Sequence, residues 1–434
     1  MTRRISRPAE IAAIVFVITA GVAFPTTAFA QTTALVGGRI IDGRGQVIER
    51  GTIILRDERI VAVGPVATTA VPAGARRVEV TGATIMPGLV NAHGHLTGAV
   101  GMRNDPGGYT RDNLIRQLSV YASYGVTTVF SLGDDQAAAF QLRNEQGAAR
   151  LAGARLFVAG PVINGTDAAT ARAMTDTVIA MTPDLLKIRI DDNLGSSRKM
   201  PEAAWRATLA RAEELKLPLA AHIFYLADAK AALLAGADII AHSVRDLEVD
   251  AEFIRELKSR NTCYTPTLTR ELSTFVYGST PPWASDPFFL KGAGAAATAE
   301  LSDPVRHAQV QASNAYQQGL RYKEALPVAA RNLKLLTDAG TRVAMGTDSG
   351  PAGRWQGFFE HLEMEMMVAA GMTPMQVIVA STGDAARCHG RQGQFGTIEP
   401  GASADLLVLN ANPLADIRNT RQIKTVWLQG RELK

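Results

Sequence analysis

The sequence predicts an α/β protein, in which a (β/α)8 barrel of the TIM type carries a small β-sandwich domain built from both ends of the chain. Through the middle of the chain, short apolar segments alternate with alanine-rich helical patterns, which is typical of parallel βα units. Both ends instead contain short β segments separated by turn residues. Ionisable residues follow the apolar segments where barrel strands would end, and barrel active sites lie at those ends.

Residues 1–30 are predicted to be a cleaved signal peptide, so that the mature protein begins at Gln31 and is periplasmic or secreted. The segment begins with three arginines, Arg3, Arg4 and Arg7. An apolar run follows at residues 11–24, and Ala28-Phe29-Ala30 then forms an A-x-A cleavage motif. The alternative is an uncleaved anchor, but the apolar run is short for a bilayer span and ends before Pro25. We therefore expect no stable membrane anchor after cleavage.

The predicted β-sandwich domain combines residues 31–85 with residues 394–434. Its apolar β segments lie at residues 34–36, 39–41, 51–55, 59–63, 404–409 and 423–428. Residues 86–393 are predicted to form the barrel. Its eight strands are expected at the segment that ends at His93 and at residues 126–131, 155–160, 185–190, 218–222, 238–242, 262–266 and 342–348.

One segment of the predicted barrel, the insertion 267–326, is much longer than an ordinary connection between a strand and a helix. It contains Trp283, Phe288 and Phe289 among prolines, and then a helical pattern from Gly294. Long insertions of this kind serve as lids or binding loops, or form dimer contacts. Both interpretations stay open, as does the formation of a homo-oligomer.

Charge and cysteine content limit the classes of function. The chain has 434 residues and a net charge of +4, and the leader holds three arginines against one glutamate, which leaves +2 on the mature chain. No basic cluster is interleaved with aromatic residues, so we expect no nucleic-acid partner. Cys263 and Cys388 are far apart in the sequence and lack Cys-x-x-Cys spacing, so we expect two buried free thiols.

Two histidines, His93 and His95, end the first barrel strand. Alternate residues of an extended chain point the same way, so both imidazoles can face one point, and Gly94 leaves the approach open. Imidazole is a common ligand of zinc and its first-row neighbours. Two ligands make only half a metal site. Taken alone, the pair is therefore also consistent with a strand end that carries two exposed histidines.

Other predicted strand ends supply further candidate ligands, which are Lys187, His222, His242 and Asp348. Lys187 lies in an apolar segment, where a charged lysine is costly unless it is paired or chemically neutralised. A lysine that forms a salt bridge or reaches solvent is the alternative. Together with the two histidines of the first strand, these residues indicate a metal centre.

The mature chain resembles the amidohydrolase superfamily, from Met86-Pro87-Gly88-Leu89-Val90-Asn91-Ala92-His93-Gly94-His95 to Gly346-Thr347-Asp348-Ser349. The resemblance is to the branch that includes imidazolonepropionase-like and Xaa-Pro dipeptidase-like enzymes. It implies two divalent metal ions, with zinc as the expected species. By this resemblance one metal is held by His93, His95 and Asp348, the second by His222 and His242, and a carboxylated Lys187 bridges the two.

The resemblance also implies how the reaction proceeds. A hydroxide that bridges the two metals attacks the substrate carbonyl, because metals lower the pKa of bound water and polarise the carbonyl. Asp348 then takes the proton and passes it to the leaving nitrogen. Asp348 and carboxylated Lys187 are therefore the expected catalytic residues.

Four residues at or just beyond strand ends are candidate contacts to a substrate carboxylate or carbonyl, and they are Arg189, Tyr225, Arg245 and Arg270. Arginine offers a bidentate fork and tyrosine a single donor. Each of the four also fits a surface or scaffold role. For His361, in an amphipathic helical pattern, a packed histidine or one behind the ligands is favoured over a metal ligand.

We expect a secreted, binuclear metal-dependent amidohydrolase that cleaves an amide bond in a small peptide or an N-acyl amino acid. The alternative enzyme hydrolyses a cyclic imide, lactone or carbamate with the same metal centre. A deaminase is disfavoured, because the mononuclear deaminase relatives lack the bridging lysine. A scaffold protein with an inactive barrel would be expected to lack one of the metal-ligating residues, and all six are present in this sequence.

Overall fold

The computed structural model describes residues 31–149 and 153–433. The predicted signal peptide, residues 1–30, lies outside the described residues. Within the described part of the chain, no helix combines the length and the apolar character needed to cross a membrane.

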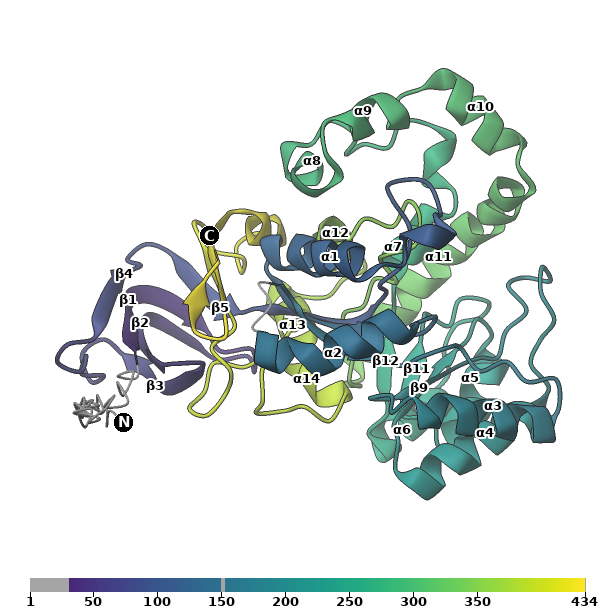
Figure 1. Cartoon of the computed structure of the whole chain (residues 1–434), viewed down its shortest axis with the longest axis horizontal. Coiled ribbons are helices and arrows are strands. Elements are labelled where there is room, and N and C mark those ends of the chain that lie inside the picture. The colour runs from purple at the N-terminus through teal and green to yellow at the C-terminus, as the bar shows by residue number, and fades with distance from the viewer. Residues whose placement is uncertain (1–30, 150–152, 434) are drawn as a thin grey trace, which may run out of the picture. The chain divides into compact units, whose positions relative to one another are not determined.

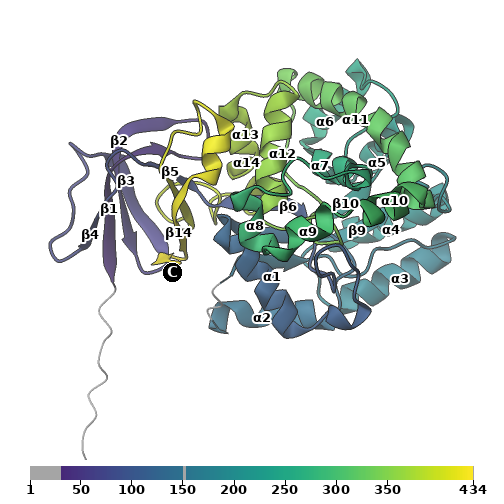
Figure 2. The same cartoon turned by 90° about the horizontal axis from the view of Figure 1, so that it is seen from above.

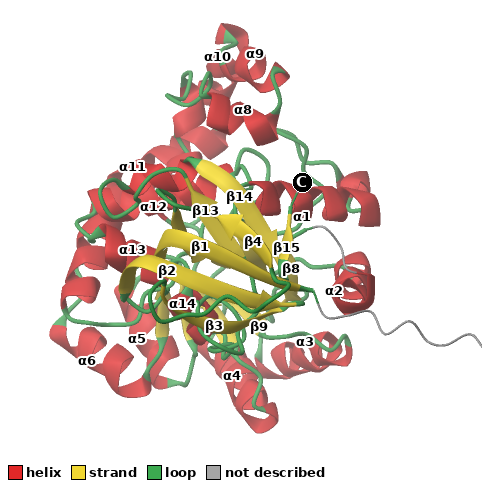
Figure 3. Cartoon of the chain, turned by 90° about the vertical axis from the view of Figure 1, so that its left-hand side faces the viewer, coloured by secondary structure: helices red, strands yellow, loops and turns green. Residues whose placement is uncertain are grey.

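One eight-stranded sheet draws strands from both ends of the chain (Figure 1). Its strands are β1 (Thr32–Ile41), β2 (Val47–Arg56), β3 (Arg59–Pro65), β4 (Arg76–Glu79), β5 (Thr84–Pro87), β13 (Leu406–Leu409), β14 (Ile423–Leu428) and β15 (Arg431–Glu432). The two ends meet where β13 pairs antiparallel with β5, and β1, β2 and β3 lie side by side beyond them (Figure 3). Buried apolar residues such as Ile40, Ile85 and Val408 form the core of this sheet.

Two further sheets consist of parallel strands. The first contains β6 (Leu89–Gly94), β7 (Val126–Ser131) and β8 (Arg155–Val158), and the second contains β9 (Leu186–Arg189), β10 (Leu219–His222), β11 (Ile239–Ala241) and β12 (Cys263–Thr265). All seven coincide with predicted strands. Their neighbours pair in parallel, as the alternation of apolar segments and helices predicts.

The eighth predicted strand, 342–348, is present only as single parallel bridges, from Val343 to Tyr264 and from Ser349 to Gly94. The backbone leaves the extended conformation at Asp348, where φ is +56°. The amides of Thr347 and Asp348 both donate to the carbonyl oxygen of His93, at 3.0 and 2.6 Å. A regular ladder cannot form where two successive amides share one acceptor.

Helices follow the parallel strands in turn and surround β6, β9 and β10 (Figure 2). They are α1 (Arg111–Ser123), α2 (Ala137–Ala149), α3 (Ala168–Ala180), α4 (Glu202–Leu215), α5 (Leu226–Leu234) and α6 (Ala251–Arg260). Side-chain caps define several starts, since Thr110, Asp167 and Asp250 each accept a backbone amide of the first turn. Beyond Ser349, which forms a bridge with Gly94, the chain continues with α12 (Phe358–Ala369), α13 (Pro374–Ala380) and α14 (Gly383–Cys388).

The long insertion is helical. It holds α7 (Leu268–Ser273), α8 (Pro287–Ala293), α9 (Ala296–Leu301), α10 (Pro304–Ala312) and the first half of α11 (Asn314–Asp338). Trp283 and Phe289 are buried and pack with Phe358 and Phe359 of α12. Whether the insertion serves as a lid or as a dimer contact stays a prediction.

The prediction of two free thiols is wrong. Cys263 and Cys388 form a disulfide, with Cα atoms 5.7 Å apart and 125 residues between them in the sequence. Cys263 begins β12 and Cys388 ends α14, and neighbouring His389 donates Nε2–H to the carbonyl of Ala92 at 3.0 Å. The pair arises because the fold carries the last helix back against the parallel strands, which sequence spacing does not reveal.

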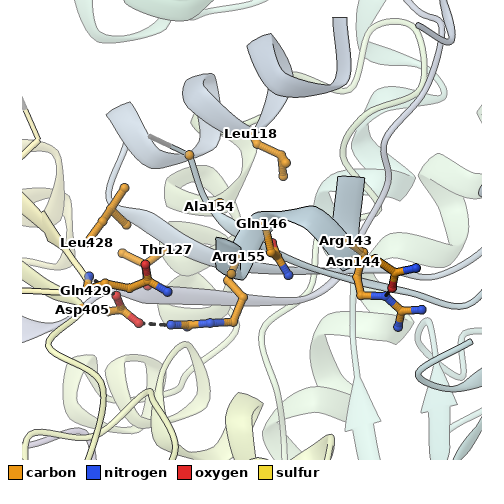
Figure 4. A pocket seen from close by; sticks show the side chains of 12 residues that line it. Leu118, Thr127, Arg143, Asn144, Gln146, Ala154, Arg155, Asp405, Leu428 and Gln429 are labelled. Carbon is orange, nitrogen blue, oxygen red and sulfur yellow. Dashed lines mark hydrogen bonds and ion pairs between the residues drawn. The ribbon is translucent and has the colours of Figure 1, made fainter. Parts of the chain in front are cut away.

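An ion pair connects the eight-stranded sheet to the start of β8 (Figure 4). Arg155 Nη1 lies 2.8 Å from Asp405 Oδ2, and the Arg155 guanidinium packs over the ring of Phe395. Arg155 and Asp405 border a cavity of about 320 Å³. Because Arg155 is the first residue of β8, this cavity lies at the amino ends of the strands, away from the predicted ligands at the carboxyl ends.

Candidate metal centre

His93 and His95 reach one point from the end of β6. Their ring centroids are 5.5 Å apart, and His93 is almost fully buried. His95 Nδ1 lies 3.1 Å from the carbonyl oxygen of Gly133, so a proton on Nδ1 leaves Nε2 free to bind a metal. Gly346 permits this packing, since a Cβ there would lie 2.6 Å from the Cβ of His93.

Asp348 completes a group of three possible metal ligands with His93 and His95. One ligand atom from each lies within 4.8 Å of the others. Asp348 Oδ1 is 2.7 Å from His95 Nε2 and 3.8 Å from His93 Nε2. The left-handed backbone of Asp348 costs about 1–3 kcal/mol, a strain that is typical of functional sites.

Lys187, His222 and His242 lie beside this group. Lys187 Nζ is 3.2 Å from His93 Nε2, and the ring centroid of His242 is 4.6 Å from that of His93 and 4.0 Å from that of His222. His242 Nδ1 lies 2.7 Å from Thr267 Oγ1, which orients its ring. Lys187 lies within β9, His222 ends β10 and His242 directly follows β11, so the three side chains come from neighbouring parallel strands.

Burial determines the charge states of these groups. Burial lowers the pKa of His93 and His242 well below the ordinary value and that of His222 to about 4, which favours the neutral, metal-binding imidazole. Burial also lowers the pKa of Lys187 to about 8, although nearby carboxylates oppose the shift. Burial acts to raise the pKa of Asp348, but Arg354 and His95 hold this pKa well below the ordinary value.

The donor atoms fit divalent metal ions. Imidazole nitrogens with a carboxylate oxygen are ligands typical of zinc. Two buried nitrogens of the predicted ligands, Nδ1 of His93 and Nε2 of His222, have no hydrogen-bond partner among the described residues. The closest charged neighbour of His222 Nε2 is Asp191 Oδ2, at 3.1 Å. A bound cation would satisfy this nitrogen and accommodate the carboxylate next to it.

All six predicted ligands line one cavity, of about 370 Å³. They are His93, His95, Lys187, His222, His242 and Asp348. This volume lies in the range of about 300–1,000 Å³ that is usual for small-molecule sites.

A buried polar network holds the segment that carries Asp348. Glu360 of α12 accepts hydrogen bonds from Asn91 Nδ2 at 2.6 Å, from Thr347 Oγ1 at 2.8 Å and from Ser349 Oγ at 2.7 Å. Asn91 in turn accepts the amide of His93 at 3.0 Å through Oδ1. Burial raises the pKa of Glu360, and these donors favour its charged form. The network therefore holds the segment that carries Asp348 against β6, which carries His93.

Only two of the four predicted substrate contacts line the cavity, Arg189 and Arg270. The Tyr225 hydroxyl instead donates to Asp192 Oδ1 at 3.0 Å. Arg245 is buried away from the cavity, where it lies 3.2 Å from Glu271 Oε1 and packs over the ring of Phe224. Because it also donates to the carbonyl of Ile223, Arg245 serves as a packing residue.

The cavity also contains charged residues that the sequence interpretation missed, Asp134 and Arg354. Asp134 follows β7, and its position just beyond a strand end is the sequence signal that marks it. Arg354 lies six residues beyond Asp348 in a loop without periodicity, and no sequence signal marks it. His361, in contrast, is buried and hydrogen-bonds to the carbonyl of Tyr124 at 2.8 Å, so it lies outside the cavity as a packed histidine.

Residues 84–433 match the amidohydrolase family. The chain belongs to that family. The match confirms the predicted resemblance and the prediction of an amidohydrolase-type enzyme at the level of the family. It is also consistent with a metal site at the His-His-Asp group, because enzymes of this family are generally metal-dependent.

Curated relatives match short segments of this amidohydrolase. Ochratoxinase of Aspergillus niger is 36% identical over 101 residues, which cover 22% of this chain and 20% of that protein. Imidazolonepropionase of Geobacillus kaustophilus is 36% identical over 88 residues, 20% of each chain. The matched segments thus span about a fifth of the length of these relatives.

Solved structures match almost the whole amidohydrolase. A putative prolidase from Bifidobacterium longum superposes with a TM-score of 0.76 at 24% identity, covering 93% of this chain and 94% of that chain. A Xaa-Pro dipeptidase with bound methionine in its active site superposes with a TM-score of 0.72 at 20% identity, covering 93% and 99%. At these identities the likeness shows the fold, and it confirms an α/β fold of the amidohydrolase type.

Proposed function

We propose that this protein is an exported, binuclear metal-dependent hydrolase that cleaves an amide bond in a small peptide or an N-acyl amino acid. The observation that carries the proposal is the cavity at the carboxyl ends of the strands, where the six ligand-type side chains occur together with arginines. A cavity with convergent polar groups and shifted pKa values is the usual form of an active site.

His93, His95 and Asp348 would hold one metal ion, and His222 and His242 a second. Lys187 is suited to bridge them as a carboxylated lysine, because burial lowers the pKa of its amine to about 8 and a neutral amine is the form that reacts with carbon dioxide. When bound, divalent metals such as zinc supply a lowered pKa for water and polarise the substrate carbonyl.

Asp348 is suited to carry the proton. Its carboxylate accepts a proton from the attacking water and delivers it to the leaving nitrogen, as a general base and then a general acid. Arg354 lies 2.5 Å from Asp348 Oδ2, which leaves Oδ1 facing His93 and His95. The side chain is thus held in one orientation.

Arg189 or Arg270 is proposed to bind a carboxylate of the substrate next to the scissile amide. Both line the cavity, and a guanidinium in a partly desolvated pocket favours an anionic ligand. Arg270 already lies 3.0 Å from Glu271 Oε2. No ion pair of Arg189 occurs within the described residues, so Arg189 is the better candidate.

The proposal also includes a closed barrel and export of the protein. Closure of the parallel strands into a (β/α)8 barrel is supported by the bridge from Ile163 to Ile188 and by the two bridges of the 342–349 segment, which join successive sheets. Cleavage of residues 1–30 and export are supported by the disulfide, because disulfides persist in oxidising compartments.

The second candidate function is hydrolysis of a neutral cyclic imide, lactone or carbamate. The decisive experiment is a screen of zinc-loaded protein against dipeptides, N-acyl amino acids, imides, lactones and carbamates. For N-acyl amino acids, kcat/KM is compared with that of the matching methyl ester or primary amide, in wild type and in Arg189→Ala and Arg270→Ala. We expect the free acids to be cleaved best and one variant to remove that preference. Equal cleavage of the neutral analogues would favour the second candidate.

A further inference from the structure

The charged side chains of the cavity divide into paired and unpaired groups. Asp348 lies 2.5 Å from Arg354 and 3.8 Å from Arg270, and Arg270 also contacts Glu271. Within residues 31–149 and 153–433, the carboxylate of Asp134 and the guanidinium of Arg189 have no hydrogen bond and no ion pair. The cavity therefore presents one free anion and one free cation to a ligand.

The position of Asp134 is set by the end of β7. Asp134 adopts a left-handed backbone with φ of +61°, directly after Gly133, whose carbonyl lies 3.1 Å from His95 Nδ1. The carboxylate thus comes from the residue next to one that orients a predicted metal ligand. Its charge also opposes the effect of burial on the pKa of Lys187, so it lies within electrostatic range of the centre.

Neighbouring Asp135 shows what a structural carboxylate looks like at this strand end. Asp135 is buried and accepts hydrogen bonds from Ser131 Oγ at 2.5 Å and from the amides of Ala159 and Gly160 at 2.9 and 3.1 Å. Asp134 has none of these contacts and is exposed to the cavity. The fold therefore gives Asp134 no hydrogen-bonded packing role.

We propose that Asp134 binds the free ammonium group of the substrate, while Arg189 binds the carboxylate at its other end, so that the preferred substrate is an unblocked, zwitterionic dipeptide. The inference rests on the proposed hydrolysis of amide bonds. It narrows the substrate class, because an N-acyl amino acid lacks the ammonium and would leave Asp134 unpaired. Charge-assisted hydrogen bonds of both ends to a partly desolvated site then orient the scissile amide between them.

The test compares unblocked dipeptides with N-acetyl dipeptides of the same sequence, using the full mature chain loaded with zinc. We expect wild type to prefer the unblocked peptides. Asp134→Asn should lower kcat/KM for them about 10- to 100-fold, mainly through KM, and should change the value for N-acetyl peptides much less. Zinc content should stay at the wild-type value. Asp192→Asn is the matched control, since it removes an equal charge just after strand β9, and Asp192 does not line the cavity.

The outcomes separate this inference from the function on which it rests. Equal cleavage of blocked and unblocked peptides, with an unchanged ratio in Asp134→Asn, would overturn the ammonium site and leave amide hydrolysis intact. Loss of zinc from Asp134→Asn would also overturn it, by showing a role in metal binding. If carbamates or imides are cleaved and no peptide or N-acyl amino acid is, the proposed function fails and the inference fails with it. If Arg189→Gln loses the preference for substrates with a free carboxylate, that result would support the proposed binding of the carboxylate by Arg189.

Discussion

Arg354 Nη1 lies 2.5 Å from Oδ2 of Asp348, and the other carboxylate oxygen of Asp348 lies 2.7 Å from Nε2 of His95. The aspartate is thus held between a guanidinium and an imidazole. Arg354 also donates through Nε to Ser273 Oγ at 3.2 Å, which connects the loop after Asp348 to the end of α7. Arg354 is therefore a positioning residue for the proposed proton carrier.

Replacement of Arg354 should reduce turnover more than metal binding. We expect Arg354→Gln to lower kcat about 10-fold, because Asp348 loses a charge-assisted hydrogen bond worth about 1.5–3 kcal/mol. Arg354→Lys should recover part of the loss, since it keeps the charge but not the fork. Steady-state kinetics and zinc content of both variants check this. Unchanged kcat in Arg354→Gln would contradict the positioning role.

Lys187 should determine the number of metal ions. We expect about two zinc ions per chain in wild type, and about one in Lys187→Ala, because loss of a bridging ligand weakens the site formed by His222 and His242. Elemental analysis after loading with bicarbonate present measures both. Saturation near one ion in wild type, with metal content and rate unaffected in Lys187→Ala, would exclude a binuclear centre.

Asp348→Asn should separate metal binding from proton transfer. The amide retains an oxygen ligand but cannot accept the proton, so some metal should remain while kcat falls roughly 10²- to 10⁴-fold. The comparison uses kcat at matched zinc occupancy. Near-normal turnover in this variant would remove Asp348 from the proton-transfer role.

The disulfide should stabilise the mature protein substantially. Reduction, or Cys388→Ala, should lower the free energy of unfolding by about 2–4 kcal/mol, because the bond closes a loop of 125 residues. Thermal unfolding with and without a reducing agent tests this. The agent should shift the Tm of wild type but not that of Cys388→Ala, and an equal shift in both would point to a different cause.

His361 should make the stability depend on pH with a defined sign. Burial lowers its pKa to about 3 in the folded protein, from an ordinary value of 6.5. Between these two values the unfolded chain binds more protons, so the stabilisation from a neutral His361 is complete above pH 6.5 and is lost as the pH falls. The stability difference between wild type and His361→Gln should shrink by about 1.4 kcal/mol per pH unit below about pH 6. Urea unfolding at pH 7, 6 and 5 measures it, and a constant or growing difference would contradict the assignment.

The sequence by itself determined the strand positions of the parallel sheets and the ligand types of the candidate centre. Strand ends follow from local hydrophobic pattern, and in parallel βα units all carboxyl ends meet on one side. The sequence alone therefore predicts that His93, His222 and Asp348 belong to one site. The predicted domain boundaries and the carboxylation of Lys187 stay predictions, since no observation on the molecule tests them.

Only the tertiary structure decided which charged side chains face the cavity and how the cysteines pair. Arg189 and Arg245 both follow apolar segments, yet one lines the cavity and the other is buried against Glu271 and Phe224. Cys263 and Cys388 meet because α14 returns to the start of β12 across 125 residues. The physical reason is the same in each case. Local pattern defines where a strand ends, but the direction of a side chain beyond that end, and the partner it meets, depend on segments that are distant in the sequence.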